Sequence, residues 1–137
     1  MPSAIEMPED RFAEIARRHG VRLLLLHGSH VSGHTHAHSD VDIAAWFERA
    51  DVSFGVLTDL AADLQPLFPE HEVDVSVLNR ADPLFLERVV EHARLLAGDP
   101  KALQRLRLYA FRRYQDHRRF LSTERRYVTA ALDRLAG

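Results

Sequence analysis

Three aspartates are the residues of this sequence whose type and spacing are best suited to chemistry. Asp40 and Asp42 stand two positions apart in the segment 40–47, which alternates between polar and apolar residues. Because strand side chains alternate between faces, both carboxylates should project from one polar face of a strand. Asp74 takes a polar position in a second alternating segment, 72–78. Adjacent carboxylates repel each other unless a cation lies between them, and oxygen ligands suit Mg²⁺. The three aspartates are therefore predicted to line one cleft and to hold a divalent metal.

Gly28 and Ser29 directly follow an apolar run, and ten residues separate Ser29 from Asp40. A glycine at a strand end lets the backbone approach a phosphate, and the serine hydroxyl and nearby N–H groups can donate to its oxygens. Aspartates alternating on an exposed strand, or an isolated Gly-Ser pair, are often ordinary surface. The combination of both with Asp74 favours a phosphate-plus-metal site.

The elements that must position these residues follow from hydrophobic periodicity. Residues 21–27, 40–47 and 72–78 are predicted strands, because they are short apolar or alternating runs. Helical spacing predicts helices over 8–19, from Ser53 to the prolines at 66 and 69, from Asp82 onward, and from Asp99 onward. We expect the last helix to be long, with a break near Ser122-Thr123. The predicted order is α-β-β-α-β-α-α.

Composition limits the class of protein. The chain has 137 residues, which suits one domain, and no cysteine, which excludes a disulfide framework, a thiolate zinc site and a thiol nucleophile. The first ten residues lack the apolar run of a signal peptide, and the longest apolar run, 23–26, is too short to span a bilayer. A cytoplasmic protein with no membrane association is expected. Residues 1–99 hold 17 acidic and 8 basic side chains, whereas residues 100–137 hold 3 and 10.

The motif in which these residues stand resembles that of a known family. The run 25–29 (LLHGS), ten further residues and then 40–44 (DVDIA) resemble the GS-x10-DxD motif of minimal nucleotidyltransferase (MNT) domains, which belong to the DNA polymerase β-like nucleotidyltransferase superfamily. Gly33 and Ser39 also match common family positions, and 72–75 (EVDV) resembles the strand with the third carboxylate.

The C-terminal part of the chain narrows the resemblance. The stretch 78–84 (LNRADPL), Leu95-Leu96 and a helix containing 114–116 (YQD) are similar to MntA-type antitoxins of HEPN/MNT toxin–antitoxin pairs. The resemblance implies an α/β (α+β) fold, the polymerase β-like nucleotidyltransferase palm, with a small mixed sheet flanked by helices and a long C-terminal helical segment. Residues 1–99 would form the nucleotidyltransferase core. Residues 100–137 would be a basic helical extension of the same compact domain.

A residue-by-residue reading of the resemblance implies an activity. Asp40, Asp42 and Asp74 would be catalytic and would hold two Mg²⁺ ions, with Asp74 also helping to deprotonate the acceptor hydroxyl. Nucleotide contacts would come from Gly28, Ser29, His30, Gly33 and Ser39. ATP would be the substrate, and AMP would pass to a tyrosine of a cognate HEPN-domain ribonuclease toxin, bound in a hetero-oligomer. Such an enzyme is the AMPylating antitoxin of a type VII pair.

Other interpretations stay open beside this one. Ser32 stands where family loops commonly carry arginine, so a phosphate contact is missing. The protein could be an antitoxin that acts by binding alone, or a small-molecule nucleotidyltransferase of the aminoglycoside-modifying kind. His34, His36 and His38 could bind Zn²⁺ or Ni²⁺, although a polar loop is the simpler interpretation. For the arginine-rich end, contact with the toxin is the preferred interpretation, a solvated helix face is the second, and nucleic-acid binding is the third.

Overall fold

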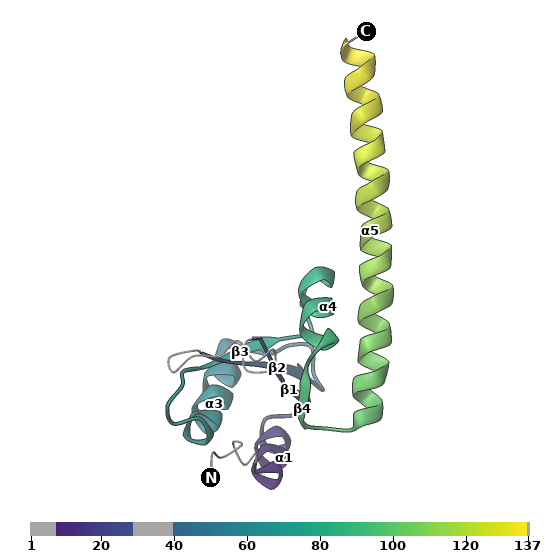
Figure 1. The fold of residues 1–137 in the computed structure, drawn as a ribbon. Coiled ribbons are helices and arrows are strands. Elements are labelled where there is room, and N and C mark those ends of the chain that lie inside the picture. The colour runs from purple at the N-terminus through teal and green to yellow at the C-terminus, as the bar shows by residue number, and fades with distance from the viewer. Residues whose placement is uncertain (1–7, 29–39, 137) are drawn as a thin grey trace.

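The computed structural model describes residues 8–28 and 40–136 (Figure 1). The first half of the described chain contains α1 (Glu9–Arg18), β1 (Val21–His27), β2 (Val41–Phe47) and α3 (Phe54–Leu64). A 3-10 turn η1 (Gln65–Leu67), β3 (Val73–Val77), α4 (Pro83–Glu91), β4 (Arg94–Ala97) and the long helix α5 (Pro100–Ala136) follow. The predicted bounds of β1 are confirmed, and the α/β class and the long C-terminal helix are confirmed as well.

The described strands form a four-stranded mixed sheet in the order β3-β2-β1-β4. β1 pairs antiparallel with both β2 and β4, whereas β2 and β3 run parallel and are joined through α3. The parallel pair puts the beginnings of β2 and β3 side by side, next to the end of β1. Residues that lie far apart in the sequence therefore meet at one end of the sheet.

A hydrophobic core lies on each face of the sheet. On the first face, the side chains of α1 and α3, led by Phe12 and Leu60, pack against the odd-numbered residues of β2 and against Leu24 and Leu26 of β1. On the second face, α4 and the first part of α5 pack against Leu23, Leu25 and Ala44. Figure 1 shows α4 and α5 side by side on one side of the sheet, away from α1 and α3.

Short hydrogen bonds fix the start and end of β3. The Gln65 side chain donates to the carbonyl of His71 and accepts from the Val73 amide at 3.1 Å, so it holds the turn that leads into β3. At the other end, the Asn79 amide group donates to the Phe47 carbonyl and accepts from the Phe47 amide, each at 2.8 Å. These bonds tie β3 to η1 and β2, and with the backbone pairing they set the register on which the site depends.

Two predicted helix caps are confirmed. Ser53 Oγ accepts from the Val56 amide at 3.3 Å at the start of α3, and Asp82 Oδ1 accepts from the Phe85 amide at 3.0 Å at the start of α4. Such caps satisfy amides that have no partner inside the helix. The cap at Asp82 also fixes where α4 begins, which matters because Phe85 contacts the candidate site.

α5 is one continuous helix whose two parts differ in environment. Ala102, Leu103, Leu106 and Ala110 are buried against the rest of the protein, and Arg107 donates to the carbonyls of α4's last turn and of Ala93. Beyond this part the helix extends away from the sheet (Figure 1). The predicted break near Ser122-Thr123 is wrong, because both hydroxyl residues are exposed and leave the backbone hydrogen bonds of the helix intact.

Two further expectations need correction. The predicted order omitted β4, a four-residue strand that follows α4 after only two residues. The face of β2 that carries Asp42 is not polar along its length, since Ala44 is fully buried and Trp46 is half-buried under α5. No helix in the described part of the chain is long and apolar enough to cross a membrane.

Candidate active site

The candidate site is the row of polar side chains where β1 ends and β2 and β3 begin. In the antiparallel pair His27 lies opposite Asp42, and in the parallel pair Asp42 lies beside Asp74. Residues paired across strands project to the same face, and neighbouring strands are about 4.8 Å apart. His27, Asp42 and Asp74 therefore form one row across three strands, on the face that α4 and α5 cover further along.

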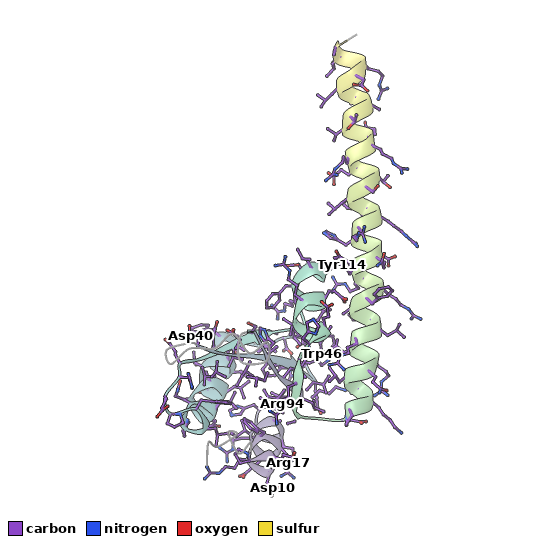
Figure 2. All side chains as sticks on the ribbon, in the orientation of Figure 1. Asp10, Arg17, Asp40, Trp46, Arg94 and Tyr114 are labelled. Atoms are coloured by element: carbon purple, nitrogen blue, oxygen red, sulfur yellow. The ribbon has the colours of Figure 1, made fainter. Side chains whose placement is uncertain are left out.

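Asp40 lies just before β2 and is exposed. It is two residues from Asp42, so an extended chain directs both side chains to the same face. The next residue, Val41, donates its amide to the Glu72 carbonyl at 2.8 Å, which keeps the chain beside β3 from its first residue. Figure 2 shows Asp40 at the end of the sheet remote from α5, whereas Trp46 lies close to α5. The predicted grouping of the three aspartates at one edge thus agrees with the strand register.

The backbone of Gly28 lies against the Asp42 carboxylate. Its φ is +80°, a conformation that favours glycine, and a Cβ built on it would overlap Asp42 Oδ2. No other residue fits here without displacing the carboxylate. The turn after β1 therefore requires glycine for conformation and for space.

His27 is a site residue that the sequence reasoning did not single out. Its Nε2 is buried without a hydrogen-bond partner in the described part of the chain, and its ring makes an edge contact with Phe85 at 6.2 Å. Burial lowers the pKa of His27, although the nearby charges of Asp42 and Asp74 oppose this effect. The signal was its alternation with Leu23 and Leu25 in β1, which places the imidazole on the same face as Asp42.

The charge at this edge suits a cation. None of the three aspartates has an arginine or lysine partner within the residues that the structure describes. Carboxylate oxygens are the ligands that Mg²⁺ accepts, usually with water and phosphate oxygens completing the shell. The donor set therefore fits a magnesium ion. Within residues 8–28 and 40–136, no three acidic or histidine side chains are already gathered into a metal site, so the ligand assignment stays a prediction.

Several predicted contacts lie outside the described residues. These are Ser29, His30, Gly33 and Ser39, which were assigned to the nucleotide, and the loop residues Ser32, His34, His36 and His38. Their roles stay predictions.

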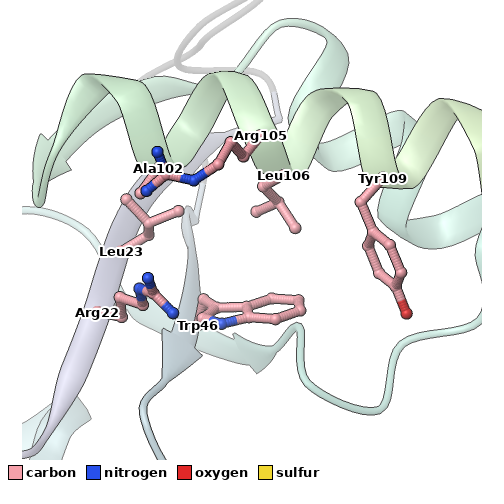
Figure 3. Close-up of a pocket in the computed structure, with 7 residues that line it drawn as sticks. All are labelled: Arg22, Leu23, Trp46, Ala102, Arg105, Leu106 and Tyr109. Carbon is pink, nitrogen blue, oxygen red and sulfur yellow. The ribbon is translucent and has the colours of Figure 1, made fainter.

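A separate pocket lies at the other end of the same face (Figure 3). It has a volume of about 260 Å³ and is lined by Arg22, Leu23, Trp46, Ala102, Arg105, Leu106 and Tyr109. The indole of Trp46 meets the ring of Tyr109 edge-on at 6.4 Å. Trp46 is four residues beyond Asp42, which is about 13 Å along a strand. The pocket is therefore distinct from the row of carboxylates.

Comparison with known families agrees with this geometry. The family model described as "Polymerase beta, Nucleotidyltransferase" matches residues 11–101, which include β1, β2 and β3. The match covers more than half of the chain, and this protein belongs to that nucleotidyltransferase family. No curated protein matches the sequence.

Solved structures show the same fold over nearly the whole chain. A toxin–antitoxin complex with AMP-PNP contains a chain that is 23% identical, with 91% of this chain and 98% of that chain covered and a TM-score of 0.70. An MntA toxin–antitoxin mutant in which two aspartates, two positions apart, are replaced by glutamate is 21% identical, with 90% and 97% covered and a TM-score of 0.67. A complex of a tri-AMPylated Shewanella oneidensis HEPN toxin with an MNT antitoxin contains a chain that is 20% identical, with 93% of this chain and 98% of that chain covered and a TM-score of 0.65.

Proposed function

We propose that this protein is an antitoxin that transfers AMP from ATP to a tyrosine of a cognate HEPN-type ribonuclease toxin and thereby neutralises it. The observation that carries the proposal is the in-register row of His27, Asp42 and Asp74 beside Gly28. Membership of the nucleotidyltransferase family supports the class of reaction. The similar fold of antitoxins from toxin–antitoxin complexes, one of them with an AMPylated toxin, supports the choice of acceptor.

Asp40, Asp42 and Asp74 are the residues that would hold magnesium. Bound there, the metal would neutralise charge on the triphosphate and on the leaving pyrophosphate. Asp42 is the best-positioned of the three, because the Gly28 backbone packs against its carboxylate and restricts where that carboxylate can lie. The imidazole of His27 lies in the row next to Asp42 and is held by an edge contact with the ring of Phe85.

The transfer itself requires one bond to form and one to break. The acceptor tyrosine oxygen forms a bond to the α-phosphorus of ATP, and the bond from that phosphorus to the oxygen bridging to the β-phosphate breaks. Pyrophosphate leaves with that bonding electron pair. The tyrosine proton passes to a carboxylate, and Asp74 suits this role because it is exposed on β3 and accessible to an incoming protein side chain.

The experiment combines the purified protein, the helical toxin encoded by the neighbouring gene, ATP and Mg²⁺, and measures the mass of the intact toxin. A gain of one or more AMP units on tyrosine is expected, and none with Asp40→Ala and Asp42→Ala combined. Replacement of Asp59, an exposed acidic residue of α3 away from the row, by alanine is the matched control and should leave the gain unchanged.

The outcomes separate the proposal from its alternatives. If the wild-type protein silences the toxin without any mass gain, and the double alanine variant does so equally well, the protein acts by binding and the proposed transfer is wrong. If AMP appears on an aminoglycoside added to the mixture and not on the toxin, the acceptor has been misidentified.

A further inference from the structure

The part of α5 that extends beyond the sheet carries an unpartnered apolar surface. We call it the docking stripe, and it consists of the exposed side chains of Phe120, Leu121, Tyr127, Val128, Leu132 and Leu135. Leu135 is 84% exposed, Tyr127 70% and Phe120 63%. Figure 2 shows that the side chains of this part of α5 stand clear of the rest of the protein.

The docking stripe continues the face by which α5 packs into its own core. At 3.6 residues per turn, eighteen residues make about five full turns, so residues eighteen apart lie on the same line along the helix. Leu121 therefore lies on the line of Leu103, and Val128 on the line of Ala110. Leu103 and Ala110 are buried, whereas their counterparts are not. The sequence thus maintains an apolar face well beyond the last residue that the protein itself covers.

An apolar face on a helix without tertiary contacts has a physical cost. Helices in proteins are stabilised mainly by packing of such a face, and monomers rarely expose contiguous apolar surface of more than a few hundred Å². None of the other described residues, 8–28 and 40–99, covers this length of α5, and we infer that another molecule covers the docking stripe. Its position within α5 also leaves the candidate active site open, because the two lie at different ends of the protein (Figure 1).

Charge identifies the kind of partner. Arg125 lies four residues after Leu121 and three before Val128, so it borders the docking stripe. Arg118 lies three residues before Leu121, and its guanidinium rests over the Tyr114 ring at 5.9 Å. Residues 115–136 contain five arginines and three acidic side chains. The bordering arginines require an acidic rim on the partner.

A second copy of this chain does not meet that requirement. In an antiparallel pair the same edge of each helix meets, so the edges that carry the arginines would face each other, with Arg118 opposite Arg125 in the register centred on residues 121 and 122. A parallel pair is obstructed because the corresponding face of residues 102–110 is already covered by α4 and the sheet. Glu124 lies within the docking stripe, three or four residues from Phe120, Leu121, Tyr127 and Val128, so it calls for a basic group at one point of the partner surface.

We propose that the docking stripe binds an apolar helical surface with an acidic rim on the toxin partner, and that it holds the complex together independently of catalysis. This inference rests on the partner named in the proposed function. It adds the surface by which that partner is held, which the catalytic row does not provide.

The decisive experiment measures toxin binding by calorimetry without ATP. Replacing Leu121 and Val128 together by glutamine should raise Kd by about 30-fold or more, as for centrally placed interface residues. Replacing Ser122 by glutamine is the matched control, since its neighbours three and four residues away on the helix are all arginines rather than residues of the docking stripe, and Kd should stay within about threefold. Circular dichroism checks that helix content is equal in all variants.

A second pair of variants tests the charge argument. Arg118→Gln with Arg125→Gln should weaken binding and flatten its dependence on salt, because charges at an interface rim act mainly through screened attraction. Arg119→Gln with Arg126→Gln removes the same charge from the opposite side and should change neither.

Each outcome has a distinct meaning. Unchanged binding by the Leu121/Val128 variant, an equal loss from Ser122→Gln, or no binding by the wild-type chain would overturn the docking proposal. A dimer of the chain alone that the Leu121/Val128 variant dissociates would assign the stripe to a second copy instead. Tight binding through the stripe without AMP transfer would sustain docking and refute the catalytic proposal. If the Leu121/Val128 variant keeps both the complex and full AMP transfer, the docking proposal is wrong and the catalytic proposal stands.

Discussion

The two faces of the sheet are covered to different extents, and this difference separates stability from chemistry. On the face of α1 and α3, the cover reaches the start of both β2 and β3, since Val41 and Val73 are buried. On the face of α4 and α5, Ala44 is fully buried, but Asp42, two residues earlier on the same strand, is only half-buried and Asp74 is exposed. The carboxylates of the candidate site lie where the cover by helices ends, so they destabilise the hydrophobic core little.

The largest effect should come from placing a carboxylate at position 44, two residues after Asp42 on that face. Ala44→Asp would place an unpaired carboxylate in the second core, and we expect a loss of at least about 4 kcal/mol in the free energy of unfolding. Urea denaturation measures this loss. The paired variant Asp42→Asn should change stability by no more than about 0.5 kcal/mol, yet lower AMP transfer by about 10³-fold. A tolerated Ala44→Asp would contradict the complete burial of this position.

Substitutions in the core of the first face should change the free energy of unfolding and leave AMP transfer unchanged. Leu60 is fully buried between α3 and the sheet, and Leu60→Ala should lower the free energy of unfolding by about 3 kcal/mol through lost burial and a cavity. AMP transfer per folded molecule should be unchanged. Leu57→Ala, on the same helix but only half-buried, is the control and should cost about 1 kcal/mol. A fall in transfer by Leu60→Ala at full folding would contradict the separation.

Two glycines with positive φ test whether the backbone of Gly28 restricts the position of the Asp42 carboxylate. Gly28→Ala and Gly20→Ala should each cost about 1 kcal/mol, because alanine is strained at φ values of +80° and +66°. Only Gly28→Ala places a Cβ against Asp42 Oδ2, whereas the space around Gly20 is open. Transfer should therefore fall by about 10²-fold for Gly28→Ala alone, since displacing a catalytic group by about 1 Å has effects of that size. Equal activities of the two variants would rule out this constraint on Asp42.

The smallest effect concerns the contact between α1 and α3. His19 Nε2 donates to Asp63 Oδ2 at 2.6 Å and Arg18 donates to the same oxygen at 3.2 Å, and these bonds lower the pKa of Asp63 from its ordinary value of 3.8. Because the unfolded chain takes up the proton first, the stabilisation is complete above pH 3.8 and disappears as the pH falls through the lower folded pKa. Asp63→Asn should lower the thermal midpoint slightly at pH 7. The difference from wild type should vanish on acidification, and a difference independent of pH would contradict the assignment.

Local patterns were sufficient for much of the fold. The bounds of β1, the caps at Ser53 and Asp82 and the start of α5 after Asp99 depend on residues close in sequence, and each was predicted. β4 was missed because four residues directly after a helix carry no alternation of their own. Its place depends on pairing with β1, a contact between distant segments.

The candidate site was predictable in composition but not in arrangement. Alternation alone places Asp40 and Asp42 on one face. The neighbourhood of Asp42 and Asp74 depends on the parallel register of β2 and β3, which a single sequence does not reveal. His27 was missed for the same reason, since its relation to Asp42 exists only across the β1–β2 pair. The burial of Ala44 and Trp46 further along that face likewise depends on α4 and α5, and the strand pattern alone does not predict it.

The continuity of α5 has a consequence for how an acceptor is chosen. The helix contains no proline after its first residue and no glycine, so it has no hinge, and its 37 residues make a rod about 55 Å long. In a complex held by the docking stripe, this rod acts as a ruler between the place of attachment and the place of reaction. The hydroxyl that is modified would then be selected by its distance from the attachment point, with little need for a recognised sequence around it.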